Sequence, residues 1–452
     1  MKHDIFGQST SLMHDTTLDS WNKAQLGFLA HAAITPQHLG DVLNGEPDFA
    51  LGQAVKGLFC LLLGRREMIQ PARDALKAAI DSTRNTPVST REMTFVLALE
   101  IWISGDPAKA VQILEEGLQV NPDDTLAMKL GHAIRFVLGD CAGMRRSVER
   151  VMPAYGSDHP GYGYLLGCHA FSLEETGDFD KAETAGRRAL ELAPDDAWGL
   201  HAVAHVFDMT GNATLGLNWL EGREATWAHC NNFRYHVWWH KALMHLDLGQ
   251  IDAVLDLYDT HVRSDQTDDY RDISNGTALL MRLELEGVNV GTRWQELADL
   301  SAARTQDGCL IFADLHYMLA LTGDGRTADA ARLVARIRRD AEICGDTAQQ
   351  RMAKPGLEAA LGLAAFGAGQ FDEAFNHLSR ARDTMQLAGG SHAQRDVFER
   401  MTIDAGLRAG KFEQAGAILD QRHVLRGHTQ DGYGVARQAM IEASRAPSVA
   451  AQ

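Results

Sequence analysis

The stretch GYLLGCHAFSLEETGDFDKAETAGRRALELAPDDAW, residues 163–198, decides the fold. Apolar residues recur at helical spacing on both sides of Gly177, and Pro194 follows the second segment. Small residues occur where two paired helices would approach closely, at Ala170, Ala182 and Ala189. The stretch therefore predicts two helices of similar length joined by a tight glycine turn.

A similar turn recurs along most of the chain. Examples are ISGDPAKA (103–110), VLGDCAGM (137–144) and GAGQFDEA (367–374). The glycines at the third position of these turns are Gly105, Gly139, Gly177, Gly211, Gly249, Gly287, Gly323, Gly369 and Gly410. Their spacing is typical of stacked helix pairs, and no segment shows the alternation of a strand. We predict an all-α solenoid of about nine to ten helix pairs, for which a closed superhelix is one compatible arrangement.

The repeating unit resembles the tetratricopeptide repeat, because the small residues, turn glycine and terminal proline of 163–198 have the spacing of that repeat. Three central segments look more specifically like the tetratricopeptide repeat protein 38 family: GLHAVAHVFDMTG (199–211), HCNNFRYHVWWHKALMHLDLGQIDAVLDLYD (229–259) and DISNGTALLMRLELEG (272–287). GGSHAQRDVFER (389–400) adds a fourth. These segments contain polar residues that repeat packing does not require. The resemblance implies a tetratricopeptide-type solenoid and implies no particular reaction.

The repeats suggest three parts of the chain. Residues 1–48 are predicted to form a helical capping segment, and 49–425 the solenoid, with His/Trp-rich repeats at 160–287. Residues 426–452 are predicted to form a C-terminal helix and tail. Within it, ASRAPSVAAQ (443–452) is expected to be disordered.

Composition narrows the class of protein. The 452 residues include 43 basic and 60 acidic side chains, and the net charge of −17 opposes binding to nucleic acid. Six scattered cysteines, none in CxxC spacing, suggest neither disulfides nor a zinc ribbon. No signal peptide and no apolar run of about 18 residues is found, so no membrane partner is expected. These features favour a reduced, cytoplasmic protein.

The repeat register predicts which side chains face the concave surface. Positions about 13, 10, 6 and 3 residues before a turn glycine share one face of the first helix of each pair. Before Gly211 these residues are Trp198, His201, His205 and Asp208. Before Gly177 and Gly249 they include Tyr164, Phe171, His236 and Trp239, and His240 lies one turn after His236.

These aromatic and imidazole groups predict a ligand pocket, since binding sites combine apolar walls with a few convergent polar groups. The predicted ligand contacts are Tyr164, Phe171, Trp198, His236, Trp239, His240 and Arg395. The simpler alternative is that the histidines are ordinary residues of a solvated groove.

A metal site is the sharper hypothesis. Histidines at i and i+4 can bind one ion, and His201/His205 and His236/His240 are two such pairs on adjacent inner helices. Asp208 could add a carboxylate. Ala202 stands where an HExxH peptidase would carry its glutamate, so a peptidase of that type is not indicated. The implied cofactor is a divalent transition metal.

Arg395, in GGSHAQRDVFER, has two interpretations. Its guanidinium could bind a carboxylate or phosphate in bidentate fashion. It could equally pair with Asp272 or Asp396 and stabilise the repeat array.

The leading functional prediction is a protein that binds a small molecule or short peptide in a His/Trp-rich concavity. One alternative is a hydrolase or lyase, in which His201 or His205 acts as general base or metal ligand, Asp208 orients it and Arg395 anchors the substrate. A second alternative is a scaffold for protein–protein interaction. A homodimer is also compatible with the sequence.

Overall fold

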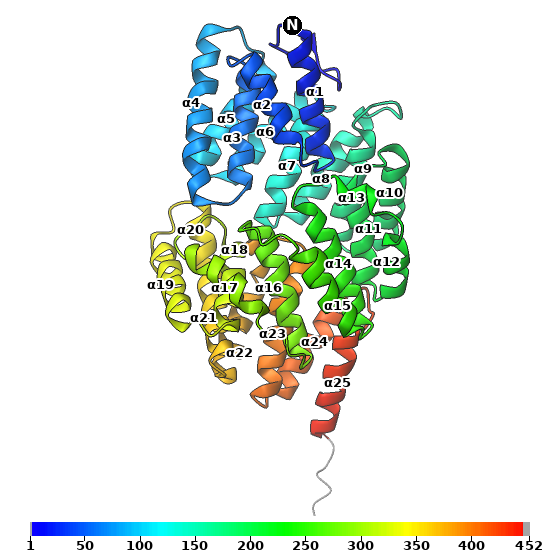
Figure 1. Ribbon diagram of the computed structural model, residues 1–452, viewed down its shortest axis with the longest axis vertical. Helices are drawn as coiled ribbons and strands as arrows, with labels where there is room; N and C mark the ends of the chain where they lie inside the picture. Colours follow the sequence, from blue (N-terminus) through cyan, green and yellow to red (C-terminus); the bar gives the residue numbers. More distant parts are fainter. Residues whose placement is uncertain (1, 446–452) are drawn as a thin grey trace, which may run out of the picture. The chain divides into compact units, whose positions relative to one another are not determined.

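A computed structural model describes residues 2–445 of the chain (Figure 1). They form two compact units. The first unit comprises residues 2–203, 222–234 and 344–350, and the second comprises residues 204–221, 235–343 and 351–445. The predicted division into cap, solenoid and tail rests on the repeat pattern, whereas the two units are defined by their compactness. The predicted division therefore stays a proposal.

The first unit is built from helices and one small antiparallel strand pair, in which Lys2 lies opposite Thr10. Its elements, wholly or for the most part, are β1 (Lys2–His3), β2 (Ser9–Thr10), α1 (Asp15–Leu29), α2 (Thr35–Gly45), α3 (Ala50–Leu62), η1 (Arg66–Met68), α4 (Ile69–Asn85), α5 (Thr90–Ile103), α6 (Pro107–Val120), α7 (Thr125–Leu138), α8 (Cys141–Val151), η2 (Met152–Ala154), α9 (Tyr162–Glu174), α10 (Phe179–Leu192), α11 (Ala197–Met209), α13 (Ala225–Ala228) and α20 (Thr347–Arg351).

Every regular element of the second unit within the described residues is a helix. Its elements are α12 (Ala213–Leu220), α14 (Phe233–Asp247), α15 (Ile251–Leu257), η3 (Tyr258–Val262), α16 (Tyr270–Leu285), α17 (Arg293–Ala303), α18 (Ile311–Gly323), α19 (Thr327–Ile343), η4 (Met352–Gly356), α21 (Leu357–Gly367), α22 (Phe371–Arg382), η5 (Met385–Ala388), α23 (His392–Arg408), α24 (Phe412–Leu425) and α25 (Gly432–Arg445).

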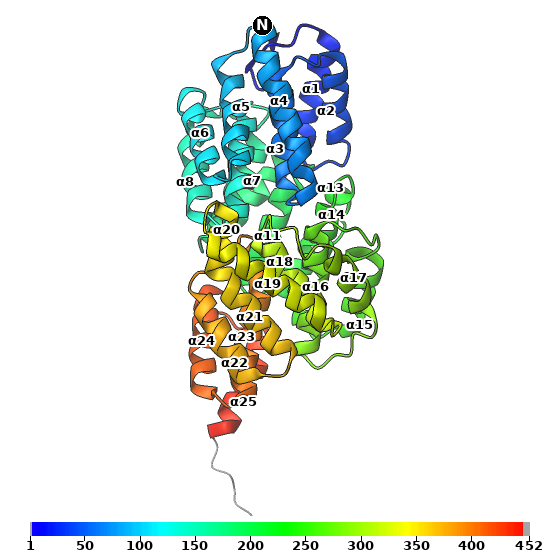
Figure 2. The same cartoon turned by 90° about the vertical axis from the view of Figure 1, so that its left-hand side faces the viewer.

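Helices that follow one another in sequence pack as pairs, as α9 does with α10 (Figure 1) and α21 with α22 (Figures 1 and 2). In the α9–α10 pair, Gly177 adopts a positive φ of 82° in the turn. Ala170, Ala182 and Ala189 are fully buried between the helices. The predicted all-α, tetratricopeptide-like fold is therefore confirmed.

One turn glycine was misplaced by the sequence pattern. Gly323 is the last residue of α18, and the positive φ of 69° falls on Gly325. A Cβ atom on Gly323 would lie 2.5 Å from the ring of Trp294, so close helix packing explains this glycine. The repeat contains two glycines, and only one of them makes the turn.

The C-terminal helix extends further than predicted. Helix α25 continues through Arg445, so the first three residues of the predicted disordered tail are helical. Residues 446–452 lie outside the described part of the chain. No helix within residues 2–445 has both the length and the apolar character needed to cross a membrane.

His316 of α18 is a core histidine of the second unit. Its Nδ1 lies 2.7 Å from the carbonyl oxygen of Phe312, and its ring packs against Phe312 and Phe398. Burial lowers the pKa of His316 to about 4, an effect that the Phe312 carbonyl opposes and Arg282 reinforces.

Acid should therefore weaken the second unit through His316. Between pH 6.5 and 4 the unfolded chain protonates this ring and the folded chain does not, so stability falls as the pH falls through this window. We expect His316 to remove about 2 kcal/mol between pH 6.5 and 5. The loss in thermal midpoint between these pH values should be smaller for His316→Leu than for wild type. An equal loss in His316→Leu and wild type would contradict this expectation.

Candidate functional site

Three buried histidines meet in the second unit. His205 comes from α11, and His236 and His240 come from successive turns of α14. One ring nitrogen from each lies within 4.8 Å of the other two. The Nε2 atoms of His236 and His240 are 3.2 Å apart, and the rings of His205 and His240 have centroids 4.3 Å apart. The sequence prediction that these residues share one face of adjacent helices agrees with this geometry.

The surroundings fix the orientation and charge of these rings. His236 Nδ1 lies 2.9 Å from Oδ1 of Asn275 on α16, and its ring stacks on Trp239. Burial lowers the pKa of His236 to about 3, against the opposing effect of Asn275. Burial also lowers the pKa of His240, and the neighbouring His205 and His236 add to this effect. His236 and His240 are therefore neutral at pH 7.

Other predicted site residues belong to the first unit. Phe171 and Trp198 are buried and pack with ring centroids 4.5 Å apart. The hydroxyl of Tyr164 donates to Asp195 at 2.8 Å, and its ring packs beside Phe6 and Leu29. Core packing accounts for these three side chains, and their role as ligand contacts stays a prediction.

His201 precedes His205 by one turn of α11 and falls in the first unit. Its ring is buried and stacks on Phe171. The i, i+4 relation with His205 is kept, and its role as a ligand or general base stays a prediction.

Asp208 and Arg395 have contacts that differ from the predicted ones. Asp208 was expected to add a carboxylate to the histidines, but it lies 3.4 Å from Nη2 of Arg426 and lines a separate cavity. Arg395 donates to the carbonyl oxygens of Gly389 and Gly390, which shapes the turn before α23. Its predicted role as a substrate anchor is untested, and it does not line that cavity.

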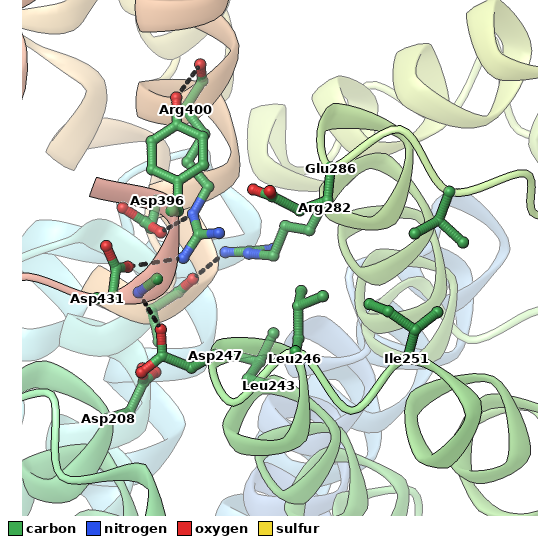
Figure 3. A pocket seen from close by; sticks show the side chains of 15 residues that line it. Asp208, Leu243, Leu246, Asp247, Ile251, Arg282, Glu286, Asp396, Arg400 and Asp431 are labelled. Carbon is green, nitrogen blue, oxygen red and sulfur yellow. Dashed lines mark hydrogen bonds and ion pairs between the residues drawn. The ribbon is translucent and has the colours of Figure 1, made fainter. Parts of the chain in front are cut away.

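The cavity has a volume of about 300 Å³ and lies wholly within the second unit (Figure 3). Its apolar wall is made by Leu243, Leu246, Ile251 and Val288. Its polar wall carries five carboxylates and two guanidinium groups, from Asp208, Asp247, Glu286, Asp396, Asp431, Arg282 and Arg400. The cavity therefore has an aliphatic side and a highly charged side.

Four of the five carboxylates are paired with arginines. Asp396 lies 2.7 Å from Arg400, and Asp431 lies 3.0 Å from the same side chain. Glu286 pairs with Arg437 at 2.9 Å, and Asp208 with Arg426. These pairs leave Asp247 as the one carboxylate on the wall with no cation within 4.0 Å among the described residues.

Arg282 is a cation of the cavity wall that, among the described residues, has no carboxylate partner at ion-pair distance. Its side chain is 1% exposed, and it donates to two helix carbonyls, those of Ala278 and Ala393. Within residues 2–445 no carboxylate lies within ion-pair distance of this guanidinium. Burial, reinforced by Arg400, lowers the pKa of Arg282 to about 9, so the group remains a cation at neutral pH. A buried cation without a counter-ion is costly and needs an explanation.

Asp247 ends α14 and faces the same cavity from another helix (Figure 3). Its Oδ1 accepts the backbone N–H of Gly432 at 2.7 Å. Burial raises the pKa of Asp247, and the nearby Asp431 raises it further. Among the described residues, the cavity thus presents one cation, Arg282, and one carboxylate, Asp247, that have no direct ion-pair partner.

The sequence reading missed Arg282, Asp247 and Arg400. One signal was present, because Arg282 is a single charge inside the apolar run ALLMRLEL of α16. The repeat register places Leu243 and Leu246 at the inner positions 6 and 3 residues before Gly249, and both line the cavity. Its polar wall includes residues from the 393–433 region, whose proximity no local pattern reveals.

The chain is similar to several solved structures at low sequence identity and low TM-score. No family model matches the chain. Yeast Tom70 shares 14% identity, covering 94% of this chain and 87% of that chain, with a TM-score of 0.34. A human IFIT1 dimer with PPP-AAAA shares 13% identity over 96% of each chain, with a TM-score of 0.43. Naa15/Naa10 bound to HypK-THB shares 12% identity, covering 95% of this chain and 67% of that chain, with a TM-score of 0.25. Similarities this low carry no argument about the fold or the function of this chain.

Proposed function

We propose that the chain is a tetratricopeptide-like binding protein whose second unit holds a small zwitterion in the cavity beside Arg282. The observation that carries this proposal is the buried Arg282 guanidinium, which forms no direct ion pair with a carboxylate of the described residues. A ligand carboxylate would supply the missing counter-ion and gain a charge-assisted hydrogen bond. Asp247 would receive the cationic end of the same molecule.

The cavity also limits the size and shape of the ligand. A volume of about 300 Å³ suits a molecule the size of an amino acid or a very short peptide. The aliphatic wall of Leu243, Leu246 and Ile251 favours a branched hydrocarbon part between or beside the two charges. This deepens the sequence prediction of a small-molecule or peptide ligand and moves the site from the histidines to the neighbouring charged cavity.

The resemblance to the tetratricopeptide repeat protein 38 family and a cytoplasmic location belong to the same proposal. The segments that carry the resemblance contain many of the residues that line the cavity, including Asp247, Arg282 and Asp396. A functional cavity explains why those segments contain polar residues that repeat packing does not require.

Four matched probes test the proposal. Thermal shift of the full-length protein would be measured with leucine, 4-methylpentanoate, 3-methylbutylamine and an uncharged branched alcohol. The proposal expects leucine to raise the melting temperature most, the carboxylate less, and the alcohol not at all. Stabilisation by the amine or alcohol alone, or by none of the four, would exclude a zwitterion site of this kind.

The variant Asp247→Asn should distinguish the contribution of the ligand's cationic end to binding from that of its carboxylate end. The amide keeps an oxygen for the Gly432 N–H but loses the negative charge. We expect it to weaken binding of leucine about 10-fold or more, and to leave the affinity for 4-methylpentanoate unchanged or improved. Titration calorimetry of both probes would measure this. An equal loss for both probes would indicate a structural role for Asp247.

A further inference from the structure

The three-histidine cluster of the second unit consists of His205, His236 and His240, and it lies outside the charged cavity. Its members come from two helices, α11 and α14, that the repeat packs together. All three rings are less than a tenth exposed. Structural packing alone would be satisfied by apolar side chains at these positions, because buried polar groups need partners and apolar ones do not.

The geometry of the rings suits a shared ion. In a tetrahedral site with metal–nitrogen bonds of about 2.0–2.1 Å, two ligand nitrogens lie about 3.4 Å apart. The Nε2 atoms of His236 and His240 are 3.2 Å apart, and a nitrogen of His205 lies within 4.8 Å of both. A small movement of the His205 ring towards the other two nitrogens would place three ligands at three corners of a tetrahedron.

Asn275 provides the hydrogen-bond partner that a metal-binding histidine needs on its other ring nitrogen. Its Oδ1 lies 2.9 Å from Nδ1 of His236, so Nδ1 donates the proton and Nε2 keeps its lone pair. That lone pair faces His240 rather than solvent. Hydrogen bonds of this kind orient metal-ligating imidazoles and fix their tautomer.

We propose that His205, His236 and His240 bind one divalent transition metal of the zinc class. Three imidazoles and no carboxylate favour Zn²⁺, Co²⁺ or Ni²⁺ over Mg²⁺ or Ca²⁺, which prefer oxygen ligands. The alternative is a metal-free cluster in which His240 Nε2 shares a hydrogen bond with His236 Nε2. This site is independent of the proposed zwitterion, since the two rest on different side chains.

The test uses Zn²⁺ alone on the full-length, untagged protein. The protein would be treated with chelator, loaded with Zn²⁺, dialysed and assayed for metal content. The proposal expects about one equivalent in wild type and less than a tenth of that in His240→Ala. His316→Ala is the matched control, because it removes another buried histidine of the same unit, and it should retain the wild-type content.

A milder variant tests the proposal in case His240→Ala does not fold. Asn275→Ala removes only the partner of His236 and should weaken Zn²⁺ binding about 10- to 100-fold in a competition assay with a chelating dye. Circular dichroism would verify folding of each variant. Wild type that retains no Zn²⁺ would overturn the proposal. So would Zn²⁺ that is retained equally by folded His240→Ala, or an Asn275→Ala protein with wild-type affinity.

Discussion

Replacement of Arg422 by methionine is expected to destabilise the second unit by about 3–5 kcal/mol, because Arg422 pairs with two buried carboxylates of the cavity wall, Asp396 and Asp431. Arg422 Nε lies 2.6 Å from Asp396, and Nη1 lies 2.9 Å from Asp431. Although burial opposes it, these carboxylates hold the pKa of Arg422 well above its usual value. Removing the cation would leave two buried carboxylates short of a partner.

A surface pair provides the control for this prediction. Arg293 pairs with Asp259 at 2.6 Å, and both side chains are partly exposed. Arg293→Met should cost less than about 1 kcal/mol. Urea unfolding followed by circular dichroism would compare the variants. Similar midpoints for Arg422→Met and wild type would show that the buried charges do not stabilise the unit.

Replacement of Arg282 by methionine, unlike that of Arg422, should raise the stability of the protein. It should also abolish binding of the proposed zwitterion. Methionine fills much of the same volume, and the two carbonyls that lose a donor, those of Ala278 and Ala393, are helix carbonyls. Removing an uncompensated buried cation should stabilise the ligand-free protein by on the order of 2 kcal/mol. The same change removes the group that would bind a ligand carboxylate, so leucine should no longer raise the melting temperature.

This combination separates a binding role from a structural one, because residues kept for function are often held at a cost in stability. Arg437→Met is the contrasting variant. Arg437 pairs with Asp404 at 3.0 Å and with Glu286, so its loss should lower the melting temperature. If Arg282→Met also lowered it by a similar amount, Arg282 would be a structural residue.

The fold could be predicted from the sequence because its signals are local. A helix pair requires a turn glycine and small residues at fixed spacing, and Gly177, Ala170 and Ala182 show them within one short stretch. Gly323 was misread because a second glycine two residues later makes the turn. The meeting of His205 with His236 and His240 could also be predicted, since the repeat places successive inner helices side by side.

The charged cavity could not be predicted in this way. Its ion pairs join residues far apart in sequence, as Arg437 and Glu286 are, separated by 151 positions. Arg282 stands out only when its lack of a carboxylate is known, and that is a fact of three-dimensional packing. One sequence shows where charges stand along a helix but not which of them are neutralised.

The most direct test of the central claim is titration calorimetry of leucine into wild type and Arg282→Met. The account predicts saturable binding of one leucine per chain in wild type and no detectable heat of binding in the variant, which should remain folded and melt at a higher temperature. Equal affinity in the two proteins would contradict the claim, because Arg282 would then not be the group that holds the ligand carboxylate.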